Sequence, residues 1–136
     1  MELCVIGAGY VGLVTAACFA EMGNRVTCLE RDPQRLMQLR QGQSPIHEPG
    51  LPALLHSGMQ AGRLLFSDDW QQALASAEVV FIAVGTPSQE DGSADLQHVL
   101  GVADSLGRHL TRPSLVVNKS TVPVGTAERV ARHIAV

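Results

Sequence analysis

Three glycines near the amino terminus have the spacing of a turn that binds phosphate. Residues 7–12 read Gly-Ala-Gly-Tyr-Val-Gly, directly after a short apolar run and at the start of a segment with helical periodicity. In that context Gly7 provides a tight turn, Gly9 lets the backbone approach a pyrophosphate, and Gly12 lets the helix lie close to the strand. The helix amino terminus then attracts the anion. The pattern predicts a dinucleotide site, the alternative being a purely structural turn.

An acidic residue lies where such sites receive the adenosine ribose. Glu30 ends a second apolar run, and a carboxylate at this position accepts hydrogen bonds from the ribose hydroxyls. It also repels a 2′-phosphate, by roughly 4 kcal/mol for unit charges about 4 Å apart near a protein surface. The basic side chain of Arg31 could bind a 2′-phosphate, but alternation along a strand would direct it to the opposite face from Glu30. We therefore expect NAD rather than NADP.

Apolar runs rich in β-branched residues alternate along the chain with segments of helical character. Continuous apolar runs suit parallel strands that are buried on both faces. The expected strands are Leu3–Ile6, Arg25–Glu30, Arg63–Ser67, Glu78–Val84 and Ser114–Ser120. Helices are expected over Tyr10–Met22, from Asp32-Pro33, over Leu51–Ser57, from Ser67-Asp68-Asp69, over Asp95–Leu110 and over Thr126–Ile134. This order predicts an α/β fold, a doubly wound parallel sheet of the Rossmann type with strand order 3-2-1-4-5 and helices on both faces.

The overall composition is that of a soluble globular domain. The 136 residues fit one domain, with 46% hydrophobic and 17% charged residues. The net charge is −3 and the basic residues form no run, which argues against a nucleic acid or a membrane surface as partner. We find no apolar stretch of transmembrane length and no signal peptide, so we expect a cytoplasmic protein.

The cysteines and histidines give no indication of a catalytic or metal site. Cys4, Cys18 and Cys28 form no C-x-x-C pair and fall in expected strands or a helix. We interpret them as small buried thiols. The five histidines lack the spacing of metal ligands and are interpreted as surface residues. We therefore expect no metal site and no catalytic residue in this chain.

Four blocks, in order along the chain, resemble the UDP-glucose/GDP-mannose dehydrogenase family. They are residues 7–13 (GAGYVGL), 45–51 (PIHEPGL), 84–87 with 91–96 (VGTP and DGSADL), and 119–126 (KSTVPVGT). The G-x-A-D-L and S-T-V-P-V-G-T forms look like the UDP-glucose branch of the family. The GDP-mannose enzymes more often read D-L-D-L and S-T-V-L-P-G-T.

The resemblance implies roles for single positions. Glu30 takes the ribose position, where the family more often has aspartate, and Arg35 matches a basic residue near the ribose or phosphate. Thr86 matches a cofactor contact and Thr121 one near the nicotinamide, whereas His47 stands where the family often has tyrosine and receives no role. Taken together, the expected cofactor-binding residues are Gly7, Gly9, Tyr10, Val11, Gly12, Glu30, Arg35, Gly85, Thr86 and Thr121.

The resemblance also implies an activity that needs a longer protein. Enzymes of this family oxidise the C6 alcohol of a nucleotide sugar to a carboxylate in two NAD-dependent steps, through a cysteine thioester. That cysteine motif does not occur in residues 1–136, so we expect a truncated chain that binds NAD without turning over a UDP-sugar. The complete enzyme would be a homodimer or higher homo-oligomer that serves nucleotide-sugar metabolism and polysaccharide biosynthesis.

Two alternatives to this interpretation stay open. The chain could belong to a GDP-mannose or another nucleotide-sugar 6-dehydrogenase, or it could be a naturally short, non-catalytic module that senses NAD. The carboxyl end in or just after an expected helix and the four family blocks favour a domain cut from a dehydrogenase.

Overall fold

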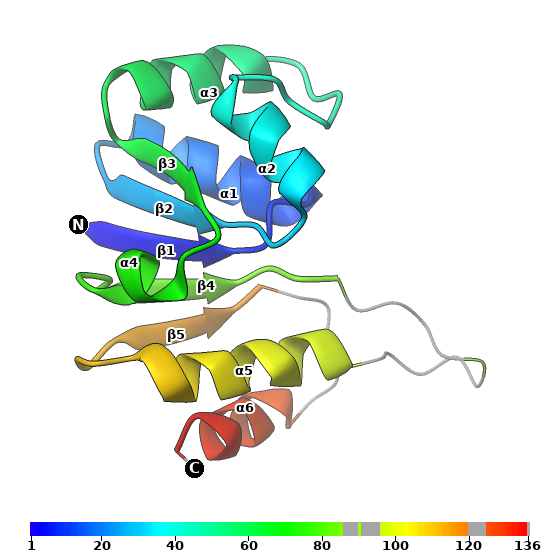
Figure 1. Cartoon of the computed structure of the whole chain (residues 1–136), viewed down its shortest axis with the longest axis vertical. Helices are drawn as coiled ribbons and strands as arrows, with labels where there is room; N and C mark the ends of the chain where they lie inside the picture. The colour runs from blue at the N-terminus through cyan, green and yellow to red at the C-terminus, as the bar shows by residue number, and fades with distance from the viewer. Residues whose placement is uncertain (86–89, 91–95, 120–124, 136) are drawn as a thin grey trace.

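The described part of the chain contains one sheet of five parallel strands. The structure is a computed structural model that describes residues 1–85, 90, 96–119 and 125–135. The strands are β1 (Glu2–Ile6), β2 (Arg25–Leu29), β3 (Leu64–Ser67), β4 (Val79–Ile82) and β5 (Leu115–Asn118). They lie in the order β3-β2-β1-β4-β5, and every neighbouring pair is parallel (Figure 1). The predicted strand order is confirmed.

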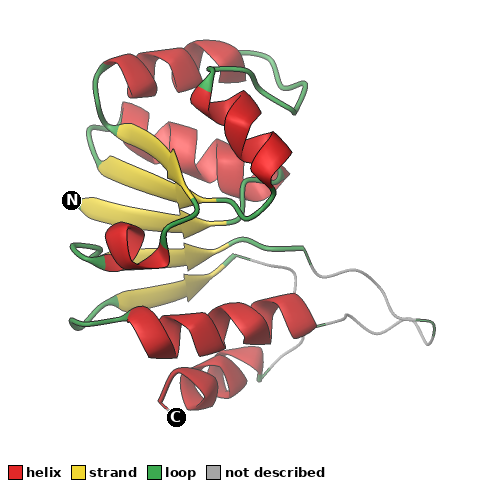
Figure 2. Cartoon of the chain, viewed as in Figure 1, coloured by secondary structure: helices red, strands yellow, loops and turns green. Residues whose placement is uncertain are grey.

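Each face of the sheet packs against its own group of helices (Figure 2). Successive residues of a strand point to opposite faces, so Leu3 and Val5 of β1 enter one core while Cys4 and Ile6 enter the other. This burial on both faces explains the continuous apolar runs. The first face is covered by α1 (Tyr10–Glu21), α2 (Pro33–Arg40) and α3 (Leu51–Gln60), and the second by α4 (Trp70–Leu74), α5 (Gln97–His109) and α6 (Thr126–Ala135).

Helices α2 and α4 begin where the expected capping residues lie. The Asp32 carboxylate accepts a hydrogen bond from the Gln34 N–H at 3.0 Å, and the Asp69 carboxylate accepts one from the Gln72 N–H at 3.2 Å. Helix α3 extends to Gln60, beyond the predicted end, because its last turns pack on α1 and β3. None of the helices in the described ranges combines the length and apolar character needed to cross a bilayer.

One of the three thiols is not buried, which corrects the expectation for Cys18. The positions of α1 that face the core are Gly12, Leu13, Ala16, Ala17 and Ala20, and Cys18 lies off that face. Cys4 and Cys28 are buried as expected, and burial raises the pKa of the Cys4 thiol to about 12 and also raises the pKa of Cys28. Thiols with such pKa values are poor nucleophiles near neutral pH.

Two of the histidines are less exposed than expected. His47, His56 and His98 are exposed, but His109 and His133 are half-buried. The His109 ring stacks on Trp70 with a centroid distance of 5.9 Å, and the His133 Nδ1 lies 2.8 Å from a carboxylate oxygen of Asp104. Packing between helices on one face of the sheet therefore covers both rings, which local sequence spacing does not indicate.

Candidate cofactor site

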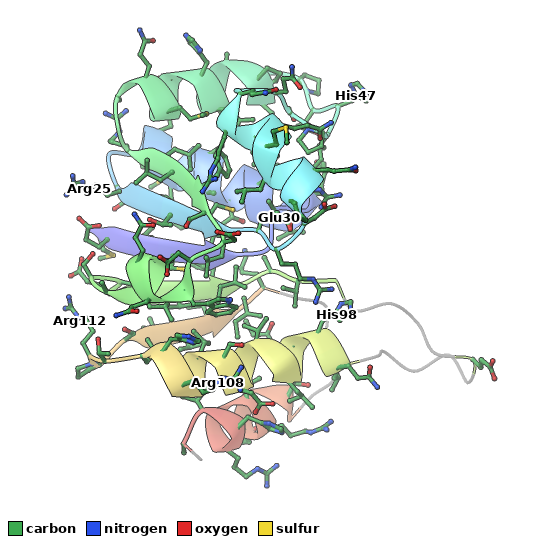
Figure 3. The ribbon with its side chains drawn as sticks, viewed as in Figure 1. Arg25, Glu30, His47, His98, Arg108 and Arg112 are labelled. Carbon is green, nitrogen blue, oxygen red and sulfur yellow. The ribbon has the colours of Figure 1, made fainter. Side chains whose placement is uncertain are left out.

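The predicted site residues that the structure describes meet at the carboxyl edge of the sheet. β1 and β4 are neighbours, and the order of strands reverses between them, which opens a crevice in doubly wound sheets. A cleft of about 800 Å³ occupies this edge and is lined by residues that follow the first four strands and by part of α5. Figure 3 shows Glu30 and His98 at this edge, and Arg25 and Arg112 at the opposite edge.

Each of the three glycines in the turn is explained by a different feature of the structure. Gly7 has φ of 103°, and a side chain there would start 2.6 Å from the Ala83 carbonyl oxygen. At Gly12 a Cβ would lie 1.8 Å from the Gly7 carbonyl oxygen, so the fold itself requires glycine. At Gly9 no atom of the described residues lies within 4 Å of the position that a Cβ would take, and φ is −75°. The space at Gly9 is therefore open to a ligand.

The amino terminus of α1 faces this open space without a side-chain cap. Gly9 is its N-cap residue, and its carbonyl oxygen accepts the first helical hydrogen bond, from the Leu13 N–H at 2.9 Å. By contrast, Asp32 and Asp69 cap α2 and α4 with their carboxylates. The first N–H groups of a helix have no partner within it, and they carry the positive end of its dipole. This terminus is therefore suited to hold an anion such as a pyrophosphate.

Glu30 is a buried carboxylate at the edge of the cleft, only 9% exposed. Its Oε1 accepts a hydrogen bond from the Ala8 N–H at 3.4 Å, and its Oε2 accepts one from the Asp32 N–H at 3.3 Å. The guanidinium of Arg35, one turn into α2, lies 3.8 Å from Oε1. An ionised carboxylate can accept about four hydrogen bonds. Glu30 is thus held in place and retains acceptor capacity towards the cleft.

Arg31 lies at the site, although the sequence predicted that its side chain points to the opposite face from Glu30. β2 ends at Leu29, so the alternation of a strand does not extend to residues 30 and 31. Arg31 is exposed and lines the same cleft as Glu30. The expectation that it faces away is therefore wrong, and the charges at this edge are one buried carboxylate with Arg31 and Arg35 beside it.

Backbone hydrogen bonds beyond the strand ends hold the loops of the site. The Gly7 N–H donates to the Leu29 carbonyl oxygen at 2.9 Å, and the Ala83 N–H donates to the Ile6 carbonyl oxygen at 2.9 Å. These bonds continue the parallel ladders of the sheet by one residue. The glycine turn is therefore fixed on both sides, and its position does not depend on exposed side chains.

A side-chain contact that was not predicted joins the glycine turn to residues 41–50. The Tyr10 hydroxyl donates a hydrogen bond to Oε2 of Glu48 at 2.9 Å, and this carboxylate raises the pKa of Tyr10. Tyr10 and Val11 are large side chains that remain 55% and 45% exposed on the first turn of α1. Tyr10 and Glu48 are 38 residues apart in the sequence, so no local pattern predicts this contact.

The structure brings together most of the expected residues that it describes. Lining the cleft are Gly7, Gly9, Glu30, Arg35 and Gly85, while Tyr10, Val11 and Gly12 belong to the first turn of α1 beside it. Thr86 and Thr121 lie outside the described residues. Sequence reasoning missed Asp68, Trp70 and the α5 residues of the lining, because tertiary packing rather than a motif places them there.

Comparison with known proteins gives a consistent result over the whole chain. Residues 1–136 match the NAD binding domain of the UDP-glucose/GDP-mannose dehydrogenase family. A UDP-glucose 6-dehydrogenase of Pseudomonas aeruginosa is 66% identical over 134 residues, which are 98% of this chain and 30% of that protein. The chain thus spans about a third of the length of such relatives.

Solved structures with this fold include two members of the same family. A UDP-glucose dehydrogenase from the archaeon Pyrobaculum islandicum superposes with a TM-score of 0.93 at 46% identity, covering 98% of this chain and 32% of that one. A ternary complex of GDP-mannose dehydrogenase from Pseudomonas aeruginosa has the same TM-score of 0.93 and coverage, at 38% identity.

The open space at Gly9 yields a test of the turn. Gly9→Val is expected to weaken NAD binding at least about 100-fold, roughly 2.7 kcal/mol, because the side chain fills the space where pyrophosphate meets backbone. The fold should lose only about 1 kcal/mol, since φ suits any residue and only the N-cap preference is lost. Isothermal titration calorimetry and denaturant unfolding measure the two effects.

Gly12→Ala is the matched control within the same turn. Its methyl group meets the backbone of Gly7, so we expect a loss of about 3 kcal/mol or more in the free energy of unfolding. A folded Gly9→Val variant that binds NAD as the wild type does would show that the pyrophosphate lies elsewhere.

Proposed function

We propose that this chain, which belongs to the UDP-glucose/GDP-mannose dehydrogenase family, holds NAD for an enzyme that oxidises the C6 alcohol of UDP-glucose to a carboxylate. The observation that carries the cofactor site is the uncapped glycine turn beside a buried carboxylate at the carboxyl edge of the sheet. UDP-glucose is favoured over GDP-mannose because the 66% identical relative is a UDP-glucose 6-dehydrogenase.

The residues of the cleft fit the pyrophosphate and the ribose of an adenosine diphosphate. The N–H groups at the start of α1 would hold the pyrophosphate, and Gly9 gives it access to the backbone. Glu30 would accept hydrogen bonds from the ribose hydroxyls, with Arg35 keeping the carboxylate in place. When bound, NAD supplies the hydride acceptor at its nicotinamide ring. Gly85, Thr86 and Thr121 remain proposed contacts, on the strength of the family resemblance.

Charge at the ribose position supports NAD over NADP. A 2′-phosphate on the ribose would meet the buried carboxylate of Glu30, which is costly to bring near a second negative group. Arg31 and Arg35 offset part of this repulsion, but the Arg35 guanidinium already lies 3.8 Å from Glu30. We therefore propose a preference for NAD that depends on Glu30.

The complete reaction would need residues from outside this chain. Oxidation of an aldehyde through a thioester requires an accessible thiolate at the site, whereas Cys4 and Cys28 have raised pKa values and lie within the core. Cys18 is exposed but does not line the cofactor cleft. We assign no catalytic role within residues 1–136. We further propose that the complete enzyme is a cytoplasmic homo-oligomer, and that its product feeds polysaccharide biosynthesis.

The cofactor preference can be measured directly on the chain. We expect tighter binding of NAD than of NADP, and Glu30→Ala should narrow the difference. The variant would lose hydrogen bonds from the ribose hydroxyls, about 1.5–3 kcal/mol for a charged acceptor, and it would also lose the repulsion of the phosphate. Calorimetric titration of both cofactors into both proteins gives the four affinities. Equal or stronger binding of NADP by the wild type would contradict the assignment of Glu30.

The activity is tested by comparing this chain with a longer protein. The product of the complete reading frame is expected to release two molecules of NADH for each UDP-glucose, read by absorbance. The 136-residue chain should release none with NAD saturating. The first oxidation needs the sugar C6 held near the nicotinamide, which we expect residues outside this chain to do. The second needs a thiolate, and no described thiol lies at the cofactor cleft. Turnover of UDP-glucose by this chain alone would show that our assignment of the catalytic residues to a part outside it is wrong. A longer protein that oxidises GDP-mannose and ignores UDP-glucose would overturn the choice of substrate.

A further inference from the structure

The family block at residues 45–51 does not line the cofactor cleft, but it forms a defined turn. The Leu51 N–H donates a hydrogen bond to the Glu48 carbonyl oxygen at 3.1 Å, which closes a β-turn over Glu48, Pro49, Gly50 and Leu51. Gly50 has φ of 83° and ψ of −15°, as the third residue of a type II turn requires, and proline suits the second position. This turn leads directly into α3.

The residues on both sides of Glu48 are anchored in the core. Leu51 is only 3% exposed, and Ile46 packs against the same core cluster as the buried face of α1. The Ser44 hydroxyl also donates a hydrogen bond to the Ile46 carbonyl oxygen at 2.7 Å. Figure 3 labels His47, which precedes Glu48 in this loop. The core and the turn therefore hold the half-buried Glu48 at a defined place.

From this place, the carboxylate of Glu48 restrains the first turn of α1. Its Oε2 accepts the hydrogen bond of 2.9 Å from the Tyr10 hydroxyl. Tyr10 is the first residue of α1, and Gly9 before it has no side-chain cap. The side chains of Tyr10 and Val11 are exposed, so core packing restrains them little. The contact with Glu48 thus adds a restraint from outside the helix at the turn whose N–H groups face the anion site.

We propose that Glu48 is a positioning residue for the anion site, and that it acts through the Tyr10 hydroxyl on the first turn of α1. The proposal rests on NAD binding at this turn and adds a group outside the cleft on which the affinity depends. Amides that are already held where a phosphate needs them lose less conformational freedom when the ligand binds. The block at residues 45–51 and the glycine turn then work as one binding unit.

The charge of Glu48 acts on an anion in the opposite direction. A carboxylate near the amino terminus of a helix interacts favourably with the helix dipole, but it repels a pyrophosphate. Loss of positioning in Glu48→Ala weakens NAD binding, whereas loss of the repulsion strengthens it. Because the Tyr10–Glu48 contact is exposed to solvent, water screens the repulsion. We therefore expect positioning to decide the sign.

Calorimetric titration with NAD measures this sign in three variants and one double variant. Tyr10→Phe and Glu48→Ala should each weaken NAD binding by about three- to tenfold, the range that one hydrogen bond contributes. The double variant should bind no more weakly than either single variant, because both changes remove the same contact. Glu48→Gln retains an acceptor for the Tyr10 hydroxyl and should restore most of the affinity.

Glu21→Ala is the matched control, because Glu21 makes a similar contact at the other end of α1. Its Oε2 accepts a hydrogen bond from the Ser57 hydroxyl of α3 at 3.5 Å. The variant removes a carboxylate and a contact between α1 and a neighbouring segment, but far along the helix from the anion site. It should leave the affinity for NAD unchanged.

The titration of Tyr10 shows whether the contact forms in solution. Tyr10 is the single tyrosine of the chain, so the ultraviolet absorbance of its phenolate reports this group alone. The hydrogen bond to Glu48 and the charge of Glu48 raise the pKa of Tyr10. Glu48→Ala should lower this pKa towards its ordinary value, and Glu21→Ala should not change it. An unchanged pKa in Glu48→Ala would overturn the contact and the proposal with it.

The affinities separate the remaining outcomes. Unchanged NAD binding in Tyr10→Phe would overturn the positioning role, whatever Glu48→Ala does, since Glu48 would then not act through the hydroxyl. Tighter binding by Glu48→Ala and Glu48→Gln would also overturn it, because the charge of Glu48 would then dominate. A wild-type chain that binds no NAD would instead contradict the proposed function itself.

Discussion

The close approach of the first turn of α1 to the end of β1 is the constraint on which the site depends. Gly12 lies so near the Gly7 carbonyl oxygen that no side chain fits between them. This approach brings the uncapped helix terminus to the point where the strand order reverses. Hydrogen bonds from Gly7 and Ala83 to the neighbouring strands then fix the turn within the sheet. The anion site is thus built from backbone, and glycine at Gly9 leaves it accessible.

The second determinant is a carboxylate that the fold places beside that terminus. Glu30 follows β2 directly and is bound by the Ala8 N–H, which belongs to the glycine turn. The parts of the proposed site that would hold the pyrophosphate and the ribose are therefore coupled through the Ala8–Glu30 hydrogen bond and a shared sheet edge. Arg35 compensates the buried charge from α2. Because the charged groups of Glu30 and Arg35 are positioned by adjacent elements, the preference between NAD and NADP depends on few residues.

Local signals were sufficient to predict the strand order and most of the glycine turn. Apolar runs indicate burial on both faces. Gly7 is required by its positive φ, and Gly12 by its contact with the Gly7 carbonyl oxygen five residues earlier. Arg31 was misplaced because the strand stops at Leu29, one residue earlier than the apolar run. Cys18 was misjudged because membership of a largely apolar helix does not by itself say which face a residue takes. The Tyr10–Glu48 bond and the α5 lining arise from tertiary packing, for which the sequence carries no local pattern.

The most direct measurement is an NMR titration of the isotope-labelled chain with NAD, following the backbone amide resonances. The N–H groups at the start of α1 should move most, namely those of Gly9, Tyr10 and Val11, together with that of Glu30. The amides of Arg25 and Arg112, at the opposite edge of the sheet, should stay in place. Shifts concentrated at that opposite edge, with the glycine turn unchanged, would contradict a cofactor site built on the amino terminus of α1.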